Sequence, residues 1–216
     1  MTKVLVPPPP TLPNPIHPWL EDREFLALYR SIQGRTLVDG LRCYMLVQLA
    51  RHVRAVPGHI AEIGVYQGGT ARLLAATRTP GKALHLFDTF AGMPECDPER
   101  DLHGRGDFAD TSLEGVRAFL GPAEDVCFHA GRFPETAAPV ETLRFSFVHV
   151  DCDIHRSVLD CCRFFHPRME RGGVLLFDDY GFVSCPGAKQ AVDEYFATQL
   201  ERPIYLPTGQ CFVIKL

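Results

Sequence analysis

The sequence predicts an α/β domain built on a mostly parallel β-sheet. From residue 59 onward, short apolar segments alternate with segments of helical periodicity. The apolar segments are nearly continuous, which is typical of strands covered by helices on both faces. Acidic residues follow several of these segments, at the strand ends where such sheets bind ligands. At 216 residues and a formal net charge of −4, the chain suits one large domain.

The N-terminal segment is expected to differ from the rest. Residues 7–18 are dense in proline, which favours an extended arm and excludes a helix or a central strand. We therefore divide the chain into a proline-rich arm over residues 1–18 and a single domain over residues 19–216. Two helices are predicted at the start of the domain, over residues 19–33 and residues 36–52. Their apolar surfaces suggest a homodimer.

The alternating elements follow in order. Strands are predicted over residues 59–65, 83–88, 126–131, 145–151 and 172–179, and helices over residues 69–78, 112–120, 156–169 and 187–200. Thr111 and Glu114 have the spacing of a helix capping box, and Pro167 should end its helix early. Two short terminal strands, residues 203–207 and 211–216, should form an antiparallel hairpin at one edge of the sheet.

Composition excludes several classes of protein. A mildly acidic chain lacks the charge expected of a general nucleic-acid binder, and no apolar stretch approaches a membrane span of about 18 residues. The prolines at positions 7–10 interrupt the start before a signal-peptide core could form. The eight cysteines form no C-x-x-C pair or zinc-site spacing. We therefore expect reduced thiols in a cytoplasmic protein.

The first strand-to-helix turn, residues 62–70, combines an acidic residue with glycines. Glycines allow a tight turn near a ligand, but the spacing is neither G-x-G-x-x-G nor a P-loop. Glu62 would repel a pyrophosphate, so a cationic or zwitterionic ligand fits better, although a purely structural turn is the alternative. Asp88 ends the second strand, where a carboxylate commonly binds ribose hydroxyls. Together these features predict an adenosine pocket without a phosphate clamp, which matches S-adenosylmethionine.

Four carboxylates follow the next two strands, namely those of Asp151, Asp153, Asp178 and Asp179. Such a cluster is costly unless a positive charge holds it together. Mg²⁺ prefers oxygen ligands and leaves coordination positions open to substrate. Salt bridges are the alternative, but basic residues are sparse nearby, with Arg156 the closest in sequence.

Several separated motifs resemble those of the macrocin O-methyltransferase family. They are EIGVYQGGTARLLA, LFDTFAGMPE, DFADTSLEGVR, the G-x-F-P-E-T of residues 131–136, VDCD and GGVLLFDDY. The similarity runs from about Thr36 to the end of the sequence. It implies a class I methyltransferase with a Rossmann-like sheet that uses S-adenosylmethionine and Mg²⁺. Members of this family methylate sugar or phenolic hydroxyls of natural products.

The resemblance also implies roles for individual residues. Cofactor contacts are expected at Glu62, Gly64, Val65, Tyr66, Gly68, Thr70, Asp88, Gly131 and Arg132. Metal ligation is expected from Asp151, Asp178 and Asp179, with Asp153 close by. The chain departs from related patterns at residues 154–158, where the catechol enzymes have a lysine in place of Ile154.

Chemistry at this site would be an in-line methyl transfer to an oxygen nucleophile of a small hydroxylated acceptor. We expect Mg²⁺ to hold two neighbouring oxygens of a vicinal diol or catechol. Asp151 or Asp153, or else His155, would receive the proton, although His155 could also be a surface residue at a helix start. Residues 92–108 could form a mobile lid or a disordered surface insertion.

Two other functions stay open at this stage. Asp151 and Asp153 resemble the D-x-D motif of metal-dependent glycosyltransferases, but that interpretation gives no role to Glu62 or Asp88. A non-catalytic module that only binds the cofactor is the third hypothesis. Retention of all four carboxylates argues against it.

Overall fold

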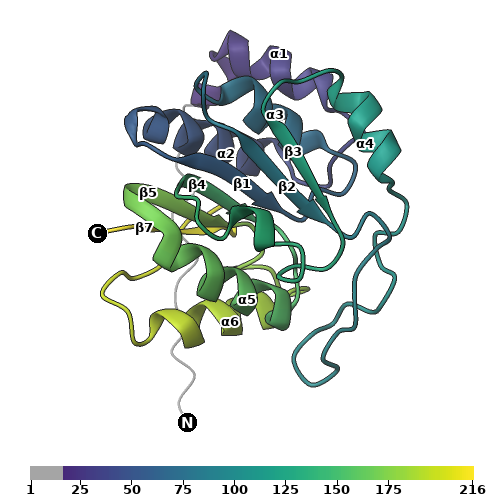
Figure 1. Ribbon diagram of the computed structural model, residues 1–216, viewed down its shortest axis with the longest axis vertical. Coiled ribbons are helices and arrows are strands. Elements are labelled where there is room, and N and C mark those ends of the chain that lie inside the picture. Colours follow the sequence, from purple (N-terminus) through teal and green to yellow (C-terminus); the bar gives the residue numbers. More distant parts are fainter. Residues whose placement is uncertain (1–16) are drawn as a thin grey trace.

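The computed structural model describes residues 17–216, so the predicted arm lies almost wholly outside the described residues. A seven-stranded sheet in the order β3-β2-β1-β4-β5-β7-β6 forms the centre of the molecule (Figure 1). The strands are β1 (His59–Ile63), β2 (Leu84–Asp88), β3 (Val126–Ala130), β4 (Phe145–Val150), β5 (Met169–Phe177), β6 (Ile204–Tyr205) and β7 (Cys211–Ile214). The first five strands are parallel, which confirms the predicted mostly parallel α/β sheet.

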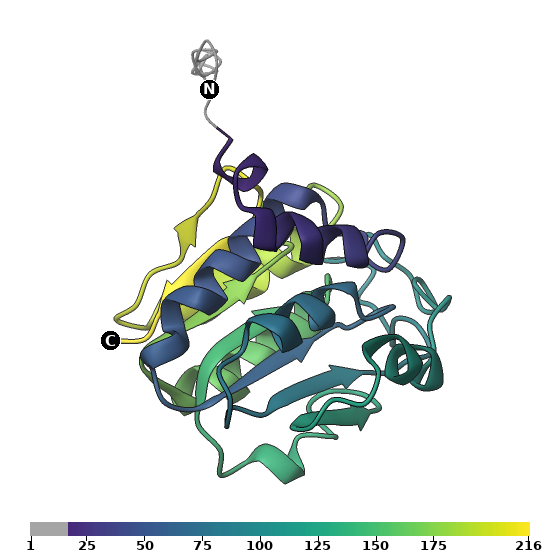
Figure 2. The same ribbon diagram turned by 90° about the horizontal axis from the view of Figure 1, so that it is seen from above.

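Helices cover both faces of the sheet. They are α1 (Arg23–Ser31), α2 (Gly40–His52), α3 (Gly69–Thr77), α4 (Leu113–Leu120), α5 (His155–Phe165) and α6 (Pro186–Phe196). Four short 3₁₀ turns accompany them: η1 (Pro18–Leu20), η2 (Val53–Ala55), η3 (Ala138–Val140) and η4 (His166–Arg168). Figure 2 shows α1, α2 and α3 across one face, while α5 and α6 pack against the other. Within residues 17–216, no helix combines the length and apolarity needed to cross a membrane.

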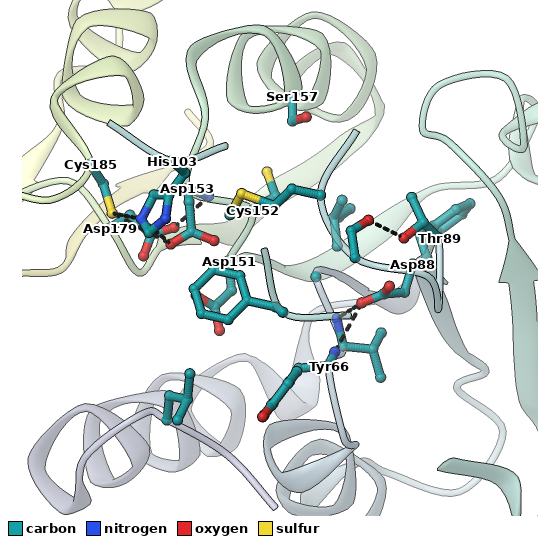
Figure 3. A pocket seen from close by; sticks show the side chains of 18 of the residues that line it. Tyr66, Asp88, Thr89, His103, Asp151, Cys152, Asp153, Ser157, Asp179 and Cys185 are labelled. Carbon is teal, nitrogen blue, oxygen red and sulfur yellow. Dashed lines mark hydrogen bonds and ion pairs between the residues drawn. The ribbon is translucent and has the colours of Figure 1, made fainter. Parts of the chain in front are cut away.

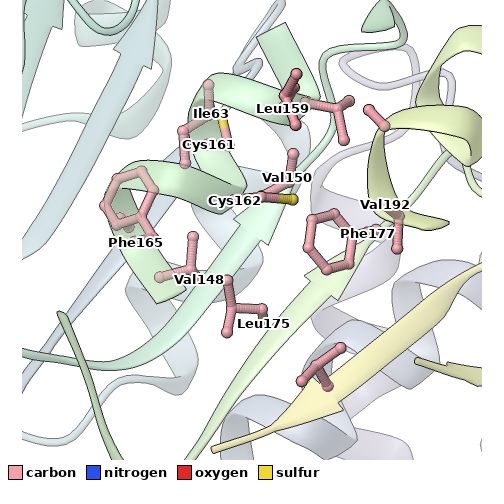
Figure 4. Packing of buried hydrophobic residues seen from close by; sticks show 14 of the residues in the cluster. Ile63, Val148, Val150, Leu159, Cys161, Cys162, Phe165, Leu175, Phe177 and Val192 are labelled. Atoms are coloured by element: carbon pink, nitrogen blue, oxygen red, sulfur yellow. The ribbon is translucent and has the colours of Figure 1, made fainter. Parts of the chain in front are cut away.

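The core has two parts, one on each face of the sheet. On the α5/α6 face, Phe165 of α5 packs with Val148 and Leu175 of the central strands (Figure 4). On the opposite face, Phe147 and Leu176 pack against α2 and α3. Each fully buried side chain of this size stabilises the fold by about 1.5–3 kcal/mol. Burial on both faces explains why the strands are continuously apolar.

Helix starts differ from the predictions because aspartates cap them. The helix expected over residues 19–33 is split into η1 and α1, since Asp22 accepts a 2.8 Å hydrogen bond from the Phe25 N–H. The next helix begins at Gly40 and not at residue 36, because the carboxylate of Asp39 accepts bonds from the N–H groups of Leu41 and Arg42. These side chains satisfy donors that a helix start leaves unpaired.

The predicted capping box at α4 is wrong by one residue. The cap is Ser112, whose hydroxyl accepts a 3.1 Å bond from Gly115 N–H. The hydroxyl of Thr111 instead donates to the carbonyl of Tyr66, in the turn after β1. Helix α5 does end before Pro167, as predicted, at Phe165. Helix α6 ends at Phe196, four residues earlier than expected.

The terminal hairpin has an order that the sequence did not indicate. Strand β7 lies between β5 and β6 and runs antiparallel to both. The short strand β6 therefore forms the outer edge and runs in the same direction as β5. Strand order reverses between β1 and β4, so the crevice that binds ligands in such sheets opens at the carboxyl ends of these two strands.

Candidate active site

A cavity lies at the carboxyl ends of β1, β2, β4 and β5 (Figure 3). Ten residues predicted to form the site line it: Gly64, Val65, Tyr66, Thr70, Asp88, Gly131, Arg132, Asp151, Asp153 and Asp179. Glu62, Gly68, His155 and Asp178 are not among the lining residues. The structure thus brings together most of the predicted cofactor and metal residues.

Asp88 fixes the turn between β1 and α3. One carboxylate oxygen accepts the N–H groups of Val65 at 2.7 Å and Tyr66 at 2.9 Å, and the other accepts Phe90 N–H at 2.7 Å. These bonds hold Tyr66 in a left-handed conformation, with φ of 51°. The same carboxylate borders the cavity, so it can face a ligand while it orders the turn around that ligand.

Gly68 acts at the start of α3 and not on the cavity wall. It is the N-cap residue of that helix and has φ of 87°. A Cβ at this position would lie 2.9 Å from Cγ1 of Val116 in α4. Gly68 therefore packs this turn against α4 and does not itself line the cavity.

Glu62 is fully buried and contacts His149 of the neighbouring strand. Its Oε1 lies 2.9 Å from His149 Nδ1, and His149 Nε2 lies 3.5 Å from Asp178 Oδ1. Burial opposes a charge on His149, but the neighbouring carboxyl groups of Asp178 and Glu62 raise the pKa of the imidazole well above its usual value. His149 thus lies between the carboxyl groups of Glu62 and Asp178, and the three buried side chains support the cavity from the sheet side.

Asp178 has two further partners that sequence reasoning missed. Arg42 of α2 forms an ion pair with Asp178 Oδ2, and Gln210 Nε2 donates a 2.8 Å hydrogen bond to Oδ1. Burial acts to raise the pKa of Asp178, but His149 and Arg42 outweigh it and lower that pKa. Arg156, the closest basic residue in sequence, pairs instead with Asp160 at 2.7 Å.

The carboxylates of Asp151, Asp178 and Asp179 converge, each offering an oxygen within 4.8 Å of the others. Burial and the neighbouring Asp178 raise the pKa of Asp151 well above its usual range. Burial, Asp153 and Asp151 do the same to the pKa of Asp179. Two of the three carboxylates therefore lack sufficient positive charge in the protein itself. An oxygen-only donor set with excess negative charge fits a hard divalent cation such as Mg²⁺.

Asp153 lies beside this group and lines the cavity. Its backbone has φ of 58°, and its N–H donates a 2.9 Å hydrogen bond to Asp179 Oδ2. Burial raises the pKa of the Asp153 carboxyl, against the opposing effect of the nearby His103.

His155 does not face the cavity. Its imidazole Nε2 lies 3.2 Å from Glu194 Oε2 and 3.0 Å from Arg100 Nη1, and the side chain is buried. Its backbone N–H, at the start of α5, donates to Asp101 Oδ1 at 2.8 Å. These contacts direct the ring toward α6 and the loop between β2 and α4. The predicted surface position of His155 is therefore wrong, and the geometry gives no support to its role as a base.

The long loop between β2 and α4 forms one wall of the cavity. Met93 N–H donates to the Asp107 carbonyl at 2.8 Å and Gly106 N–H to the Met93 carbonyl at 3.0 Å, so the two arms of the loop pair with each other. His103 and Phe108 from this loop line the cavity, as does Cys185 before α6. No local sequence pattern indicated His103 or Cys185, because they meet only through the fold.

Three features together define a class I methyltransferase. They are the strand order, the ordered β1–α3 turn with Asp88, and the aspartate carboxylates that line the same cavity. The family model for macrocin-O-methyltransferase (TylF) matches residues 30–207. The chain belongs to this family and is an S-adenosylmethionine-dependent O-methyltransferase. Family membership favours this function over a glycosyltransferase or a non-catalytic module.

Individual relatives agree with this assignment. The chain is 30% identical to the 8-demethyl-8-(2,3-dimethoxy-alpha-L-rhamnosyl)-tetracenomycin-C 4'-O-methyltransferase of Streptomyces olivaceus, over 82% of this chain and 72% of the relative. It is 33% identical to the demethyldecarbamoylnovobiocin O-methyltransferase of Streptomyces niveus, over 66% of this chain and 59% of the relative. The solved structure of the O-methyltransferase NovP superposes with a TM-score of 0.73 at 25% identity, covering 84% of this chain and 82% of that one.

Proposed function

We propose that this enzyme methylates a hydroxyl of a sugar-bearing or catechol-like natural product with the help of Mg²⁺. The observation that carries the proposal is the position of the carboxylate group of Asp151, Asp178 and Asp179. Asp151 and Asp179 line the same cavity as the β1–α3 turn and Asp88, and Asp178 has an oxygen within 4.8 Å of theirs. A methyl donor and a metal-bound acceptor can therefore be neighbours.

The cofactor side of the cavity suits an adenosine with a cationic methyl group. The wall on this side of the cavity contains the β1–α3 turn, through Gly64, Val65 and Tyr66. It also contains the Asp88 carboxylate and the residues Gly131 and Arg132. Within this cavity Asp151 and Asp153 add negative charge, which favours a sulfonium and would repel a phosphate.

Asp151, Asp178 and Asp179 would hold the divalent cation. When bound, Mg²⁺ lowers the pKa of a hydroxyl that coordinates it and so makes the oxygen a better nucleophile. A positive charge here also offsets the burial that raises the pKa of Asp151 and Asp179, so both carboxylates would be ionised.

Asp153 is the group we propose as the base. It lines the cavity, while its backbone bond to Asp179 fixes its position. Asp151 is the less suitable candidate because we assign it to the metal.

The acceptor side of the cavity has an apolar surface with one cation. Leu37, Phe108 and Phe182 line it, and the guanidinium of Arg42 lies over the Phe182 ring at 4.6 Å from its centroid. Such a surface suits the face of a sugar or an aromatic ring. The names of the two curated relatives, which act on a dimethoxy-rhamnosyl tetracenomycin and on demethyldecarbamoylnovobiocin, support a natural-product acceptor that can carry a sugar.

The proposal is tested by a methyl-transfer assay with labelled S-adenosylmethionine and a panel of glycosylated and catechol acceptors. Removal of Mg²⁺ by a chelator should abolish turnover, and added Mg²⁺ should restore it. Asp178→Asn should lower turnover by about 10- to 100-fold, the usual effect of weakening a metal site. The affinity for S-adenosylhomocysteine, measured by calorimetry, should change little.

Asp193→Asn is the matched control. Asp193 lies on α6 and contacts Tyr180 and Lys189, and none of these three residues lines the cavity. This variant should keep the wild-type rate. Full turnover in the presence of chelator would overturn the role of Mg²⁺. Absence of transfer to every hydroxylated acceptor would overturn the substrate class.

A further inference from the structure

A second group of metal-ligating side chains meets in the same cavity, beside the three carboxylates. His103 comes from the loop between β2 and α4, Asp153 from the turn after β4, and Cys185 from the residue before α6. All three line the cavity, and Figure 3 shows the imidazole of His103 next to the sulfur of Cys185 and the carboxylate of Asp153. The group differs from its neighbour in offering nitrogen, oxygen and sulfur.

The spacing of the three ligand atoms is that of a tetrahedral metal site. Cys185 Sγ lies 3.4 Å from Asp153 Oδ1 and 3.7 Å from His103 Nε2, and Nε2 lies 3.8 Å from Oδ1. Ligands at usual zinc bond lengths of about 2.0–2.3 Å lie about 3.3–3.6 Å apart in a tetrahedron. Metal binding would therefore require these three interatomic distances to change by only a few tenths of an ångström.

Outer contacts orient the histidine for ligation. His103 Nδ1 lies 3.3 Å from Asp107 Oδ2, and the same oxygen accepts a 2.9 Å bond from Gly104 N–H. A carboxylate on one ring nitrogen directs the lone pair of the other toward a metal, an arrangement found at most metal-bound histidines. This second observation is independent of the three ligand distances.

We propose that His103 Nε2, Asp153 Oδ1 and Cys185 Sγ form a binding site for a thiophilic transition metal such as Zn²⁺, with the fourth position open to the cavity. On binding, the metal–sulfur bond replaces the S–H bond of Cys185, and the proton leaves to solvent. Mg²⁺ prefers oxygen ligands, so it would favour the three-carboxylate group and leave this site to softer ions.

Occupation of this site would inhibit methyl transfer. It would engage Asp153, which we propose as the base, and would tie the long loop to the start of α6 through His103 and Cys185. This consequence rests on the proposed function, whereas metal binding itself does not.

Co²⁺ is the probe for binding, added to the full chain in excess Mg²⁺. One equivalent should produce a thiolate-to-cobalt charge-transfer band in the near ultraviolet, and Zn²⁺ should displace it. Cys185→Ser should abolish the band, and His103→Ala should weaken Co²⁺ binding by about 10- to 100-fold. Cys96→Ser is the matched control and should keep the band, because Cys96 lies in the same loop as His103 but its Sγ donates to the Pro94 carbonyl and is not one of the three ligands.

Thermal unfolding of each variant shows whether it folds, and Asp178→Asn should keep the cobalt band because Asp178 is not one of the three ligands. A wild-type protein without the band, or a band that persists in Cys185→Ser, would overturn the proposal. Zn²⁺ should also inhibit the wild type more than Cys185→Ser, each relative to its own rate without Zn²⁺. If methyl transfer proves independent of Mg²⁺ while the band is present, the proposed function fails and this site stands.

Discussion

Two backbone segments meet at the centre of the site, where β1 and β4 end. Gly64 has φ of 89°, and a Cβ built on it would overlap the carbonyl oxygen of Asp151. Only a residue without a side chain allows this approach. This close contact places Asp151, one of the proposed metal ligands, directly beside the β1–α3 turn.

Gly64→Ala should therefore lower the free energy of unfolding by more than about 4 kcal/mol, or prevent folding, because the backbone of one strand end must move. Gly81→Ala is the matched control. Gly81 has a similar φ of 85°, but a Cβ there meets nothing within 4 Å. It should cost only about 1–2 kcal/mol of backbone strain. Urea denaturation measures both, and equal losses would contradict the steric explanation.

The sequence could predict the residues that follow strands, but not their partners. Asp151 and Asp179 were found because each follows an apolar strand, and parallel strands end at the same edge. Arg42, in contrast, reaches Asp178 from a helix 136 positions earlier in the chain. Nothing in the local pattern around Arg42 distinguishes it from other helix surface residues. His149 lies fully buried in β4, where the apolar pattern of the strand gives no sign that it contacts the carboxyl groups of both Glu62 and Asp178.

At the scale of elements, the start of α4 connects a helix to the cofactor turn. Two neighbouring hydroxyl groups have different roles. The Ser112 hydroxyl caps α4, and the Thr111 hydroxyl donates a hydrogen bond to the carbonyl of Tyr66. Because the two residues are adjacent and chemically similar, sequence alone could not assign these tasks. The central strands β1, β2 and β4 were predicted more accurately, since their nearly continuous burial leaves a clear apolar pattern.

Ser112→Ala should lower the free energy of unfolding by about 1 kcal/mol, the usual cost of losing an N-cap. Its affinity for S-adenosylhomocysteine should stay near wild type. Thr111→Val keeps the shape of the side chain but removes the bond to the turn, so it should weaken that affinity. Denaturation and calorimetry on both variants separate the two tasks. The assignment fails if Thr111→Val loses stability alone and binds normally.

At the scale of the whole molecule, a buried ion cluster joins the end of α5 to the end of β7. Glu201 Oε1 lies 2.6 Å from Lys215 Nζ and accepts the N–H of Leu216, while Oε2 lies 3.4 Å from His166 Nε2. Burial opposes the charge on Glu201, but Lys215 and the backbone donors outweigh it and lower the pKa to about 2. The carboxylate thus stabilises the fold above the unfolded-state pKa, and this contribution is lost as the pH falls toward 2.

Glu201→Gln should lower the free energy of unfolding at pH 7 by about 2 kcal/mol, the contribution of a hydrogen bond to a charged group. The difference from wild type should shrink as the pH falls from about 4.5 toward 2, because both side chains are then neutral. Denaturation curves across this range measure it, with exposed Glu124→Gln as the control. A gap that stays constant with pH would show that the charge of Glu201 is unimportant.

The position of β7 inside the sheet has a consequence for biosynthesis. Strand β5 carries the Asp178 and Asp179 pair at its end, and its outer edge is covered only by residues 211–214. While the polypeptide is still emerging from the ribosome, that edge exposes unpaired amide groups next to apolar side chains, the kind of surface that nucleates aggregation. Gln210, directly before β7, donates a hydrogen bond to Asp178, so the segment that covers the edge of β5 also completes the contacts of Asp178 and is synthesised after both.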